Sequence, residues 1–402
     1  MQADILLEFD GSGEKLMNLL TPSKFKISTE KPTYSKLQGV STQSLRRLLK
    51  EMEVAPELEG GYRRALRFRK IARNACNYDI TSKCNLFCEG CFYFEGDAQT
   101  RLSEKNDIRS WESFFSGQCE AGVSFANFAG AEPALVQDRL KVAAKYIKRG
   151  AIFTNGTIKI DEELPYVLSI SVWGDEKETK KFRGGETFWK AIRNFARDPR
   201  ARFVHTINGH NLDSIENVAE ILDGEGARFA FNYFSPTKSY LEKLNIAADN
   251  DNGFFRFSNA QYNMMLSTGE LAKAHDKIGS IIDKYPMSCL HTHEFNRWAT
   301  QEKERYKIDG TSGNAINCNG RNFKWHSAYG VDMKPIESKC CTPNIECSEC
   351  RLFAPGLNTI LFHMEKYSAD TKSFREWLSI CDQWGRLFLL DDDEVWAGQN
   401  IG

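Results

Sequence analysis

Three cysteines lie close together in the stretch CNLFCEGC, which runs from Cys84 through Cys88 to Cys91. Three thiolates can bind three irons of a [4Fe-4S] cluster, which leaves the fourth iron open to a small molecule that carries an amino and a carboxylate group. The same spacings occur in zinc sites, where the fourth ligand would come from elsewhere in the chain. The stretch therefore predicts a metal centre whose last coordination position the loop itself does not fill.

A second group of cysteines falls in a glycine-containing region near the C-terminus: Cys318, Cys340, Cys341, Cys347 and Cys350. Adjacent side chains point in different directions, so we expect only one of the neighbouring pair to bind, and the C-x5-C-x2-C spacing favours Cys341 over Cys340. Four thiolates close a site, which suits an iron-sulfur cluster or a structural zinc ion, and CSEC looks like half of a zinc ribbon. Two further cysteines could complete a longer pattern, Cys289 and Cys381.

Strand-like runs alternate with amphipathic helical stretches around the first cysteine group. Strands are expected at residues 76–80, 123–130, 151–156, 167–174, 202–207 and 228–234, and helices at 111–122, 134–150, 185–198, 212–226 and near 259–284. Repeated strand–helix units predict a parallel sheet, either open or closed into a barrel. Such sheets place ligand sites at the carboxyl ends of their strands. The cysteine loop directly follows the first strand, so it would lie at that functional rim.

The chain divides into three predicted regions. Residues 1–75 contain a helical stripe at Leu45, Leu48, Leu49 and Met52 and a basic end, and they read as an extension that covers a larger domain. Residues 76–285 hold the alternating units. Residues 286–402 begin near Pro286 and look irregular, which fits a small domain around the second cysteine group.

Composition excludes several partners. Lys plus Arg (53) and Asp plus Glu (54) nearly cancel, so no overall charge favours nucleic acid or a membrane. The N-terminus lacks the pattern of a signal peptide, and no apolar run approaches the roughly 18 residues that a membrane span needs. We therefore expect a cytoplasmic protein, where the 12 cysteines are better suited to metal binding or redox work than to a disulfide framework.

The cysteine loop in this context resembles that of the radical S-adenosylmethionine (SAM) superfamily, over about residues 76–232. AGAEP is similar to the family's GGEP motif with Ala131 in place of a glycine, and Gly90 stands where the family often has an aromatic residue. The resemblance implies an α/β fold, a partial (β/α)6 TIM-like barrel. It also implies that Cys84, Cys88 and Cys91 hold a [4Fe-4S] cluster whose open iron binds SAM.

The same resemblance implies which residues contact SAM. Glu132 would lie near the methionine amino group, and Arg183, expected in the loop before the next helix, would pair with the carboxylate. The full predicted set is Phe92, Tyr93, Gly130, Ala131, Glu132, Thr154, Asn155, Ser169, Ser171 and Arg183. No side chain is assigned to catalysis.

The second cysteine group resembles the auxiliary-cluster extensions called SPASM and Twitch. A complete SPASM pattern has more cysteines than this region carries, so the resemblance implies one Twitch-like auxiliary [4Fe-4S] cluster. Its ligands would be Cys318, Cys341, Cys347 and Cys350.

The function implied by the resemblance is hydrogen abstraction from an unactivated C–H bond by a 5'-deoxyadenosyl radical. The expected substrate is a small metabolite such as a sugar or aminocyclitol, which would be oxidised, epimerised or otherwise tailored. The alternatives are radical modification of a ribosomal peptide or protein and, in another class, a zinc-binding interaction protein. An electron donor such as flavodoxin or ferredoxin is implied as a partner.

Six other polar residues are weaker candidates. Four fall near predicted strand ends, where they could line a substrate cavity: His205, Asn208, Asn232 and Tyr233. The remaining two, His291 and His293, would share one face if their segment were extended.

Overall fold

The computed structural model describes residues 47, 50–53, 55–95, 102–245, 257–322, 327–336 and 345–397. Most of the predicted N-terminal stripe, namely Leu45, Leu48 and Leu49, lies outside these residues. The division of the chain into three regions stays a prediction.

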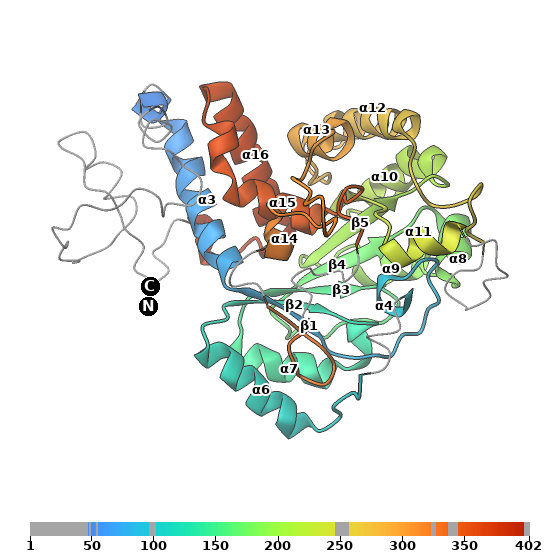
Figure 1. The fold of residues 1–402 in the computed structure, drawn as a ribbon. Coiled ribbons are helices and arrows are strands. Elements are labelled where there is room, and N and C mark those ends of the chain that lie inside the picture. Colours follow the sequence, from blue (N-terminus) through green and yellow to red (C-terminus); the bar gives the residue numbers. More distant parts are fainter. Residues whose placement is uncertain are drawn as a thin grey trace, which may run out of the picture.

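A parallel sheet of seven strands forms the centre of the molecule (Figure 1). Its order is β6-β5-β4-β3-β2-β1-β7. The strands are β1 (Ala75–Asp79), β2 (Phe125–Ala129), β3 (Gly150–Thr154), β4 (Val167–Val172), β5 (Ala201–Ile207), β6 (Phe229–Tyr233) and β7 (Ser327–Tyr329). The first six strands are the six that the sequence predicts, and they lie side by side in chain order. A singly wound sheet of this kind that does not close on itself is a partial (β/α)6 barrel, so the predicted fold class is confirmed.

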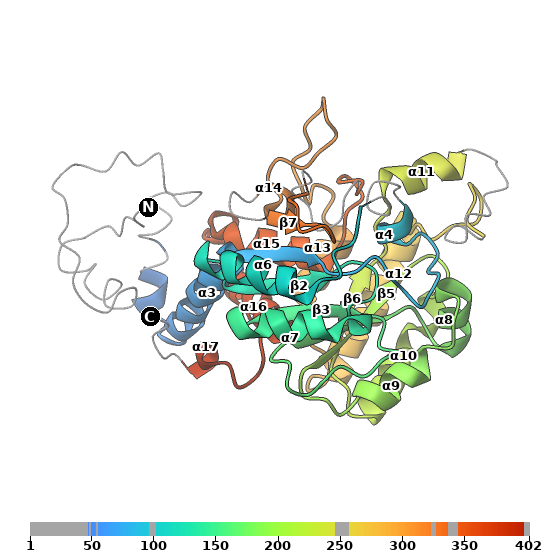
Figure 2. The ribbon, with the colours of Figure 1, turned by 90° about the horizontal axis from the view of Figure 1, so that it is seen from below.

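Helices cover both faces of the sheet. They are α3 (Glu57–Arg73), α4 (Phe92–Glu95), α6 (Ile108–Glu120), α7 (Gln137–Tyr146), α8 (Glu176–Arg183), α9 (Phe188–Phe195), α10 (Ile215–Gly224), α11 (Lys238–Asn245), α12 (Thr268–Lys284), α13 (His293–Gln301), α14 (Asn319–Asn322), α15 (Phe353–Phe362), α16 (Thr371–Phe388) and α17 (Glu394–Ala397). In Figures 1 and 2, α6 and α7 lie together on one side of β1–β3, and α3, α15 and α16 gather on the other. Among the described residues, no helix is long and apolar enough to cross a membrane.

Alternation along the strands decides which side chains face which helices. Tyr78 and Phe128 point outward, where their rings contact Phe115 of α6 with centroids 5.2 and 6.1 Å away. On the inner face, the ring of Phe125 contacts Trp384 and Phe388 of α16. Successive strand residues point to opposite faces of a sheet. The inner face therefore carries the residues of β1 and β2 that alternate with Tyr78 and Phe128. Helix α16 covers this inner face as a lid.

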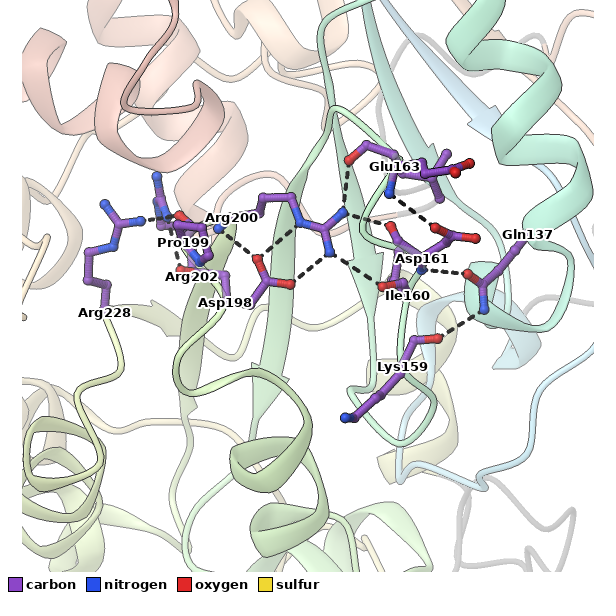
Figure 3. A network of polar contacts seen from close by, with 12 residues as sticks. Gln137, Lys159, Ile160, Asp161, Glu163, Asp198, Pro199, Arg200, Arg202 and Arg228 are labelled. Carbon is purple, nitrogen blue, oxygen red and sulfur yellow. Dashed lines mark hydrogen bonds and ion pairs between the residues drawn. The ribbon is translucent and has the colours of Figure 1, made fainter.

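A polar network joins the loops at the amino ends of β4 and β5 (Figure 3). The Arg200 guanidinium pairs with Asp198 at 2.7 Å and donates to the carbonyls of Asp161 and Leu164, each at 2.8 Å. Arg200 is buried, so these bonds satisfy a cation that would be costly to bury alone. The network fixes the end of the sheet opposite to the cysteine loop.

Several elements differ from the sequence-based expectations. Helix α8 was not predicted, and α12 begins at Thr268, after a Ser267 capping box, instead of near residue 259. The region after Pro286, which looked irregular, contains α13, α15 and α16. It also supplies β7, which pairs with β1 in parallel.

Candidate active site

A cavity of about 350 Å³ lies at the carboxyl ends of the strands. Its lining includes all three cysteines of the first group, Cys84, Cys88 and Cys91, and every residue predicted to contact SAM. That second set is Phe92, Tyr93, Gly130, Ala131, Glu132, Thr154, Asn155, Ser169, Ser171 and Arg183. Side chains that are far apart in sequence thus meet in one place because parallel strands end at one edge.

The cysteine loop is held by backbone hydrogen bonds to the end of α8. The amide of Phe87 donates to the Arg183 carbonyl at 3.2 Å, and the amide of Glu89 donates to the Phe182 carbonyl at 2.6 Å. The fully buried Glu89 carboxylate accepts a hydrogen bond from the amide of Ser258 at 3.0 Å. Glu89, which lies between two cysteines, therefore ties the loop to a distant segment, a role that the sequence did not reveal.

Gly90 has a conformation that explains why no aromatic side chain stands at this position. Its φ angle is +57°, in the left-handed region that favours glycine. A Cβ atom here would lie 3.0 Å from the ring of Tyr240 and 3.8 Å from that of Phe234. The two rings already occupy the space beside the loop, and Phe234 lines the cavity.

The three thiols interact electrostatically across the cavity. Burial, and next the neighbouring Cys88, raise the pKa of the Cys91 thiol to about 12, and burial also raises the pKa of Cys84. Binding of iron would therefore release protons from these groups.

Within the described residues, no three His, Cys, Asp or Glu side chains are grouped closely enough for one metal ion. A single tetrahedral ion would need sulfurs roughly 3.8 Å apart, whereas in a cubane cluster each cysteine binds a different iron. Three thiols that line one cavity are compatible with such a cluster.

Glu132 connects the second and third strand ends. It is 1% exposed, and its carboxylate accepts hydrogen bonds from Thr154 Oγ1 at 2.7 Å, the Asn155 amide at 2.8 Å and the Ala134 amide at 3.0 Å. Burial raises its pKa, and these donors oppose the shift. A carboxylate has about four acceptor sites, so one remains for a cofactor amine.

Arg183 lies on a helix, which corrects the expectation that it would lie in a loop. It is the last residue of α8, which begins with a capping box at Asp175 and ends at Gly184 in the left-handed conformation. Its Nε lies 3.5 Å from Cys88 Sγ, and its Nη1 donates to the Ser171 carbonyl. The remaining guanidinium donors are available to an anionic group in the cavity.

A buried ion pair lies behind the cysteine loop. Glu104 accepts hydrogen bonds from Ser82 N at 2.9 Å and from its Oγ at 2.5 Å, and Arg139 Nη1 donates to Glu104 at 2.7 Å. Burial raises the pKa of Glu104, but the bonds from Ser82 and the ion pair outweigh it and lower the pKa to about 2. Sequence inspection missed this support, because neither residue belongs to a recognisable motif.

Residues close in sequence to the second cysteine group line the same cavity, although its described cysteines do not. Cys318, Cys347 and Cys350 are all buried, and Gly320 and Leu352, each two residues from one of these cysteines, line the cavity. The favoured fourth ligand, Cys341, and its neighbour, Cys340, lie outside the described residues. Cys289 and Cys381 are buried in the core.

The six weaker polar candidates separate into different places. Asn232 and Tyr233 line the cavity, whereas His205 and Asn208 are buried away from it. His291 is buried, whereas His293 begins helix α13 and its Nε2 lies 2.8 Å from Asp283 Oδ1. The segment is therefore not extended through both histidines, and they do not share one face.

The cavity lining also includes polar residues of β1 and β2 that the sequence analysis did not select: Asn77, Asp79 and Asn127. They alternate with buried apolar residues on β1 and β2. Parallel strands covered on both faces are usually apolar throughout. On β1, the polar residues at alternate positions, Asn77 and Asp79, were therefore a signal that one face of this strand is polar.

No family model matches the chain, and no curated protein matches its sequence. Among solved structures, Streptococcus suis SuiB bound to S-adenosylmethionine is similar at 13% identity, over 66% of this chain and 60% of that chain, with a TM-score of 0.45. SuiB bound to precursor peptide SuiA is also similar at 13% identity, over 82% and 70%, with a TM-score of 0.48. Native anSMEcpe with bound AdoMet is similar at 15% identity, over 78% and 88%, with a TM-score of 0.45. The chain spans 60% of the length of the first SuiB structure, and identities at this level leave its function open.

Proposed function

We propose that the chain is a radical SAM enzyme. One observation carries the proposal: the three loop cysteines and the whole set of residues expected to contact SAM line a single cavity at the carboxyl ends of the strands. Each motif alone is weak. A site for a [4Fe-4S] cluster and SAM requires these motifs to meet, in the order and on the strands that the resemblance implies.

The residues of the cavity have distinct roles in this proposal. Cys84, Cys88 and Cys91 hold a [4Fe-4S] cluster, which, together with SAM, supplies reductive cleavage to a 5'-deoxyadenosyl radical and hydrogen abstraction from the substrate. Arg183 places a positive charge in the cavity, with its Nε 3.5 Å from Cys88 Sγ, which favours an anionic ligand group. Trp384 and Phe388 cover the cavity and limit access of water.

The second cysteine group would hold an auxiliary [4Fe-4S] cluster through Cys318, Cys341, Cys347 and Cys350. The position of Gly320 and Leu352 in the cavity wall supports this role, because an auxiliary cluster there would adjoin the substrate. Such a cluster suits a net oxidation in which an electron leaves the substrate. A flavodoxin or ferredoxin would reduce the first cluster.

The substrate in this proposal is a small metabolite such as a sugar or aminocyclitol. The outer edge of β6 is occupied, because the amide of Phe229 donates to Ser288 and the amide of Leu290 donates to Phe229, at 2.8 and 2.7 Å. This pairing blocks addition of a peptide strand at the Phe229 end of β6, which supports the metabolite over the peptide alternative.

Anaerobic reconstitution tests the proposal. We expect a brown protein with about eight irons, of which roughly four disappear when Cys84, Cys88 and Cys91 are changed to Ala. With dithionite, the wild type should convert SAM to 5'-deoxyadenosine, as detected by chromatography, and the triple variant should not. Cys119→Ala is the control, because Cys119 is exposed on α6 outside both groups. A colourless, zinc-loaded wild type that never cleaves SAM would refute the proposal.

A further inference from the structure

Asp79 is a carboxylate on the inner face of β1. It lines the cavity, as does Asn77 two residues earlier, whereas the intervening Tyr78 points outward into the core beside α6. Asp79 is partly buried in the wall of this cavity. It lies one strand away from Glu132, the carboxylate that follows β2.

The Asp79 carboxylate has no hydrogen-bond or ion-pair partner among the residues that the structure describes. Burial is the cause that raises its pKa, to about 7, and no neighbouring donor opposes this shift. Glu132 in the same cavity accepts three hydrogen bonds from protein donors. A partly buried carboxylate without a protein partner in the described residues is available to a ligand in the cavity, and carboxylates with raised pKa values are characteristic of functional sites.

Two more polar groups in the cavity wall lack a partner within the described part of the chain. They are the hydroxyl of Tyr93, whose side chain is 7% exposed, and Oδ1 of Asn127. Tyr93 and Asp79 interact electrostatically, so the two side chains are neighbours. Asn127 lies diagonally across from Asp79, because Asp79 pairs in register with Ala129. Strand spacing puts the Cα atoms of such a pair about 8 Å apart, a gap that a small polar group can bridge.

These groups need a ligand that donates several hydrogen bonds and carries positive charge. The carboxylate and the amide oxygen only accept hydrogen bonds, and a phenol oxygen can also accept. An ammonium group has three donors, whereas a hydroxyl has one. We propose that the cavity binds its substrate through a protonated amine, which Asp79 receives as an ion pair, with Tyr93 and Asn127 as further acceptors.

The amine belongs to a ligand other than SAM. The methionine amino group is expected at the first cluster, beside Glu132, which retains one acceptor site. Elsewhere the cavity wall offers aromatic and apolar surface from Phe125, Phe153 and Trp384. The site therefore suits a compact primary amine. In naming a substrate, this inference rests on the proposed function.

Binding of two probes of equal shape tests the inference without turnover. Benzylamine and benzyl alcohol are titrated calorimetrically into cluster-loaded protein with SAM and no reductant, at about pH 8, where Asp79 is ionised. We expect benzylamine to bind the wild type at least tenfold more tightly than benzyl alcohol. Asp79→Asn should remove this preference and leave the affinity for SAM intact. Asp213→Asn, an equal charge change at an exposed position outside the cavity, should keep the preference.

Three outcomes would overturn the inference: a wild type that does not bind benzylamine, a wild type that binds both probes equally, or an Asp79→Asn variant that keeps the preference. Loss of SAM affinity in Asp79→Asn would overturn it as well, because Asp79 would then belong to the cofactor site. Iron content and SAM cleavage, measured on the same preparations without probes, separate the two proposals. Protein that cleaves SAM without preferring the amine refutes the inference alone, and protein that prefers the amine without iron or SAM cleavage refutes the enzyme.

Discussion

Replacing Arg139 by Met removes the cation of the buried ion pair behind the cysteine loop. Methionine retains much of the length and apolar character of the arginine stem, so it keeps contact with the Trp111 ring, over which the guanidinium now lies at 5.2 Å. The change removes the 2.7 Å bond to Glu104, the bond to the Ile80 carbonyl and the 3.0 Å bond to Asn106. Glu104 remains as a carboxylate without its positive partner.

The expected loss of unfolding free energy follows from burial. The side chains of Arg139 and Glu104 are 5% and 9% exposed, and breaking a buried pair by removal of one partner costs about 3–5 kcal/mol. The bonds that Glu104 keeps from Ser82 favour the lower end, about 3 kcal/mol. The control is Arg63→Met, because the pair of Arg63 with Glu59 is 44% and 32% exposed within one helix and contributes about 0.5 kcal/mol.

Urea unfolding at neutral pH, followed by circular dichroism under anaerobic conditions, measures both variants. Glu104→Gln and the double variant complete a mutant cycle, in which the double variant should be more stable than the sum of the single losses implies. The reasoning is refuted if Arg139→Met loses under 1 kcal/mol or no more than Arg63→Met. It is also refuted if the cycle shows no coupling to Glu104.

Three further predictions concern stability, measured by unfolding. Gly90→Ala should lower the free energy of unfolding by about 2 kcal/mol, because the φ angle of Gly90 is +57° and the new Cβ would lie 3.0 Å from Tyr240. The control, Gly117→Ala, lies in open space on α6 and should raise the free energy of unfolding by up to about 1 kcal/mol. Equal effects of the two variants would contradict this. Asp79→Asn should stabilise the protein at about pH 8 by at most about 4 kcal/mol, because the pKa of Asp79 rises from 3.8 to about 7 on folding. This gain in stability should vanish as the pH falls toward 4. A stability difference that does not change with pH would argue against the raised pKa as its cause. Burial lowers the pKa of His205 from 6.5 to about 3, so His205 stays neutral in the folded protein while it becomes protonated in the unfolded chain. The folded protein should therefore lose about 2 kcal/mol of stability between pH 7 and 5, and His205→Phe should show a shallower decline over that range.

The strands and the first cysteine loop were predictable because their signals are local. The six runs of β-branched and aromatic residues predicted β1–β6, and the loop position after β1 followed from chain order. Helix α8 was missed because its sequence is dominated by charge and carries almost no apolar stripe. Its capping box, Asp175 with Glu178, was the usable signal. Strand β7 has three residues and pairs with a strand some 250 positions away, so no local pattern indicates it.

The polar inner face was not predictable for a different physical reason. Both faces of this sheet are covered, by α6 on one side and α16 on the other, so both sets of alternating side chains are buried. The alternation in CNYDI shows that Asn77 and Asp79 share a face, but it does not show which face borders the cavity. That choice depends on α16, which packs on the sheet from the far end of the chain.

The walls of the cavity are made at very different times during synthesis. The loop with Cys84, Cys88 and Cys91 leaves the ribosome long before α16, which ends at Phe388, 297 residues after Cys91. At roughly 5–20 residues per second, this interval lasts about 15–60 seconds. Until then the chain lacks Trp384 and Phe388, the aromatic residues of α16 that line the cavity. The sheet and the cysteine loop are therefore synthesised well before this part of the cavity wall.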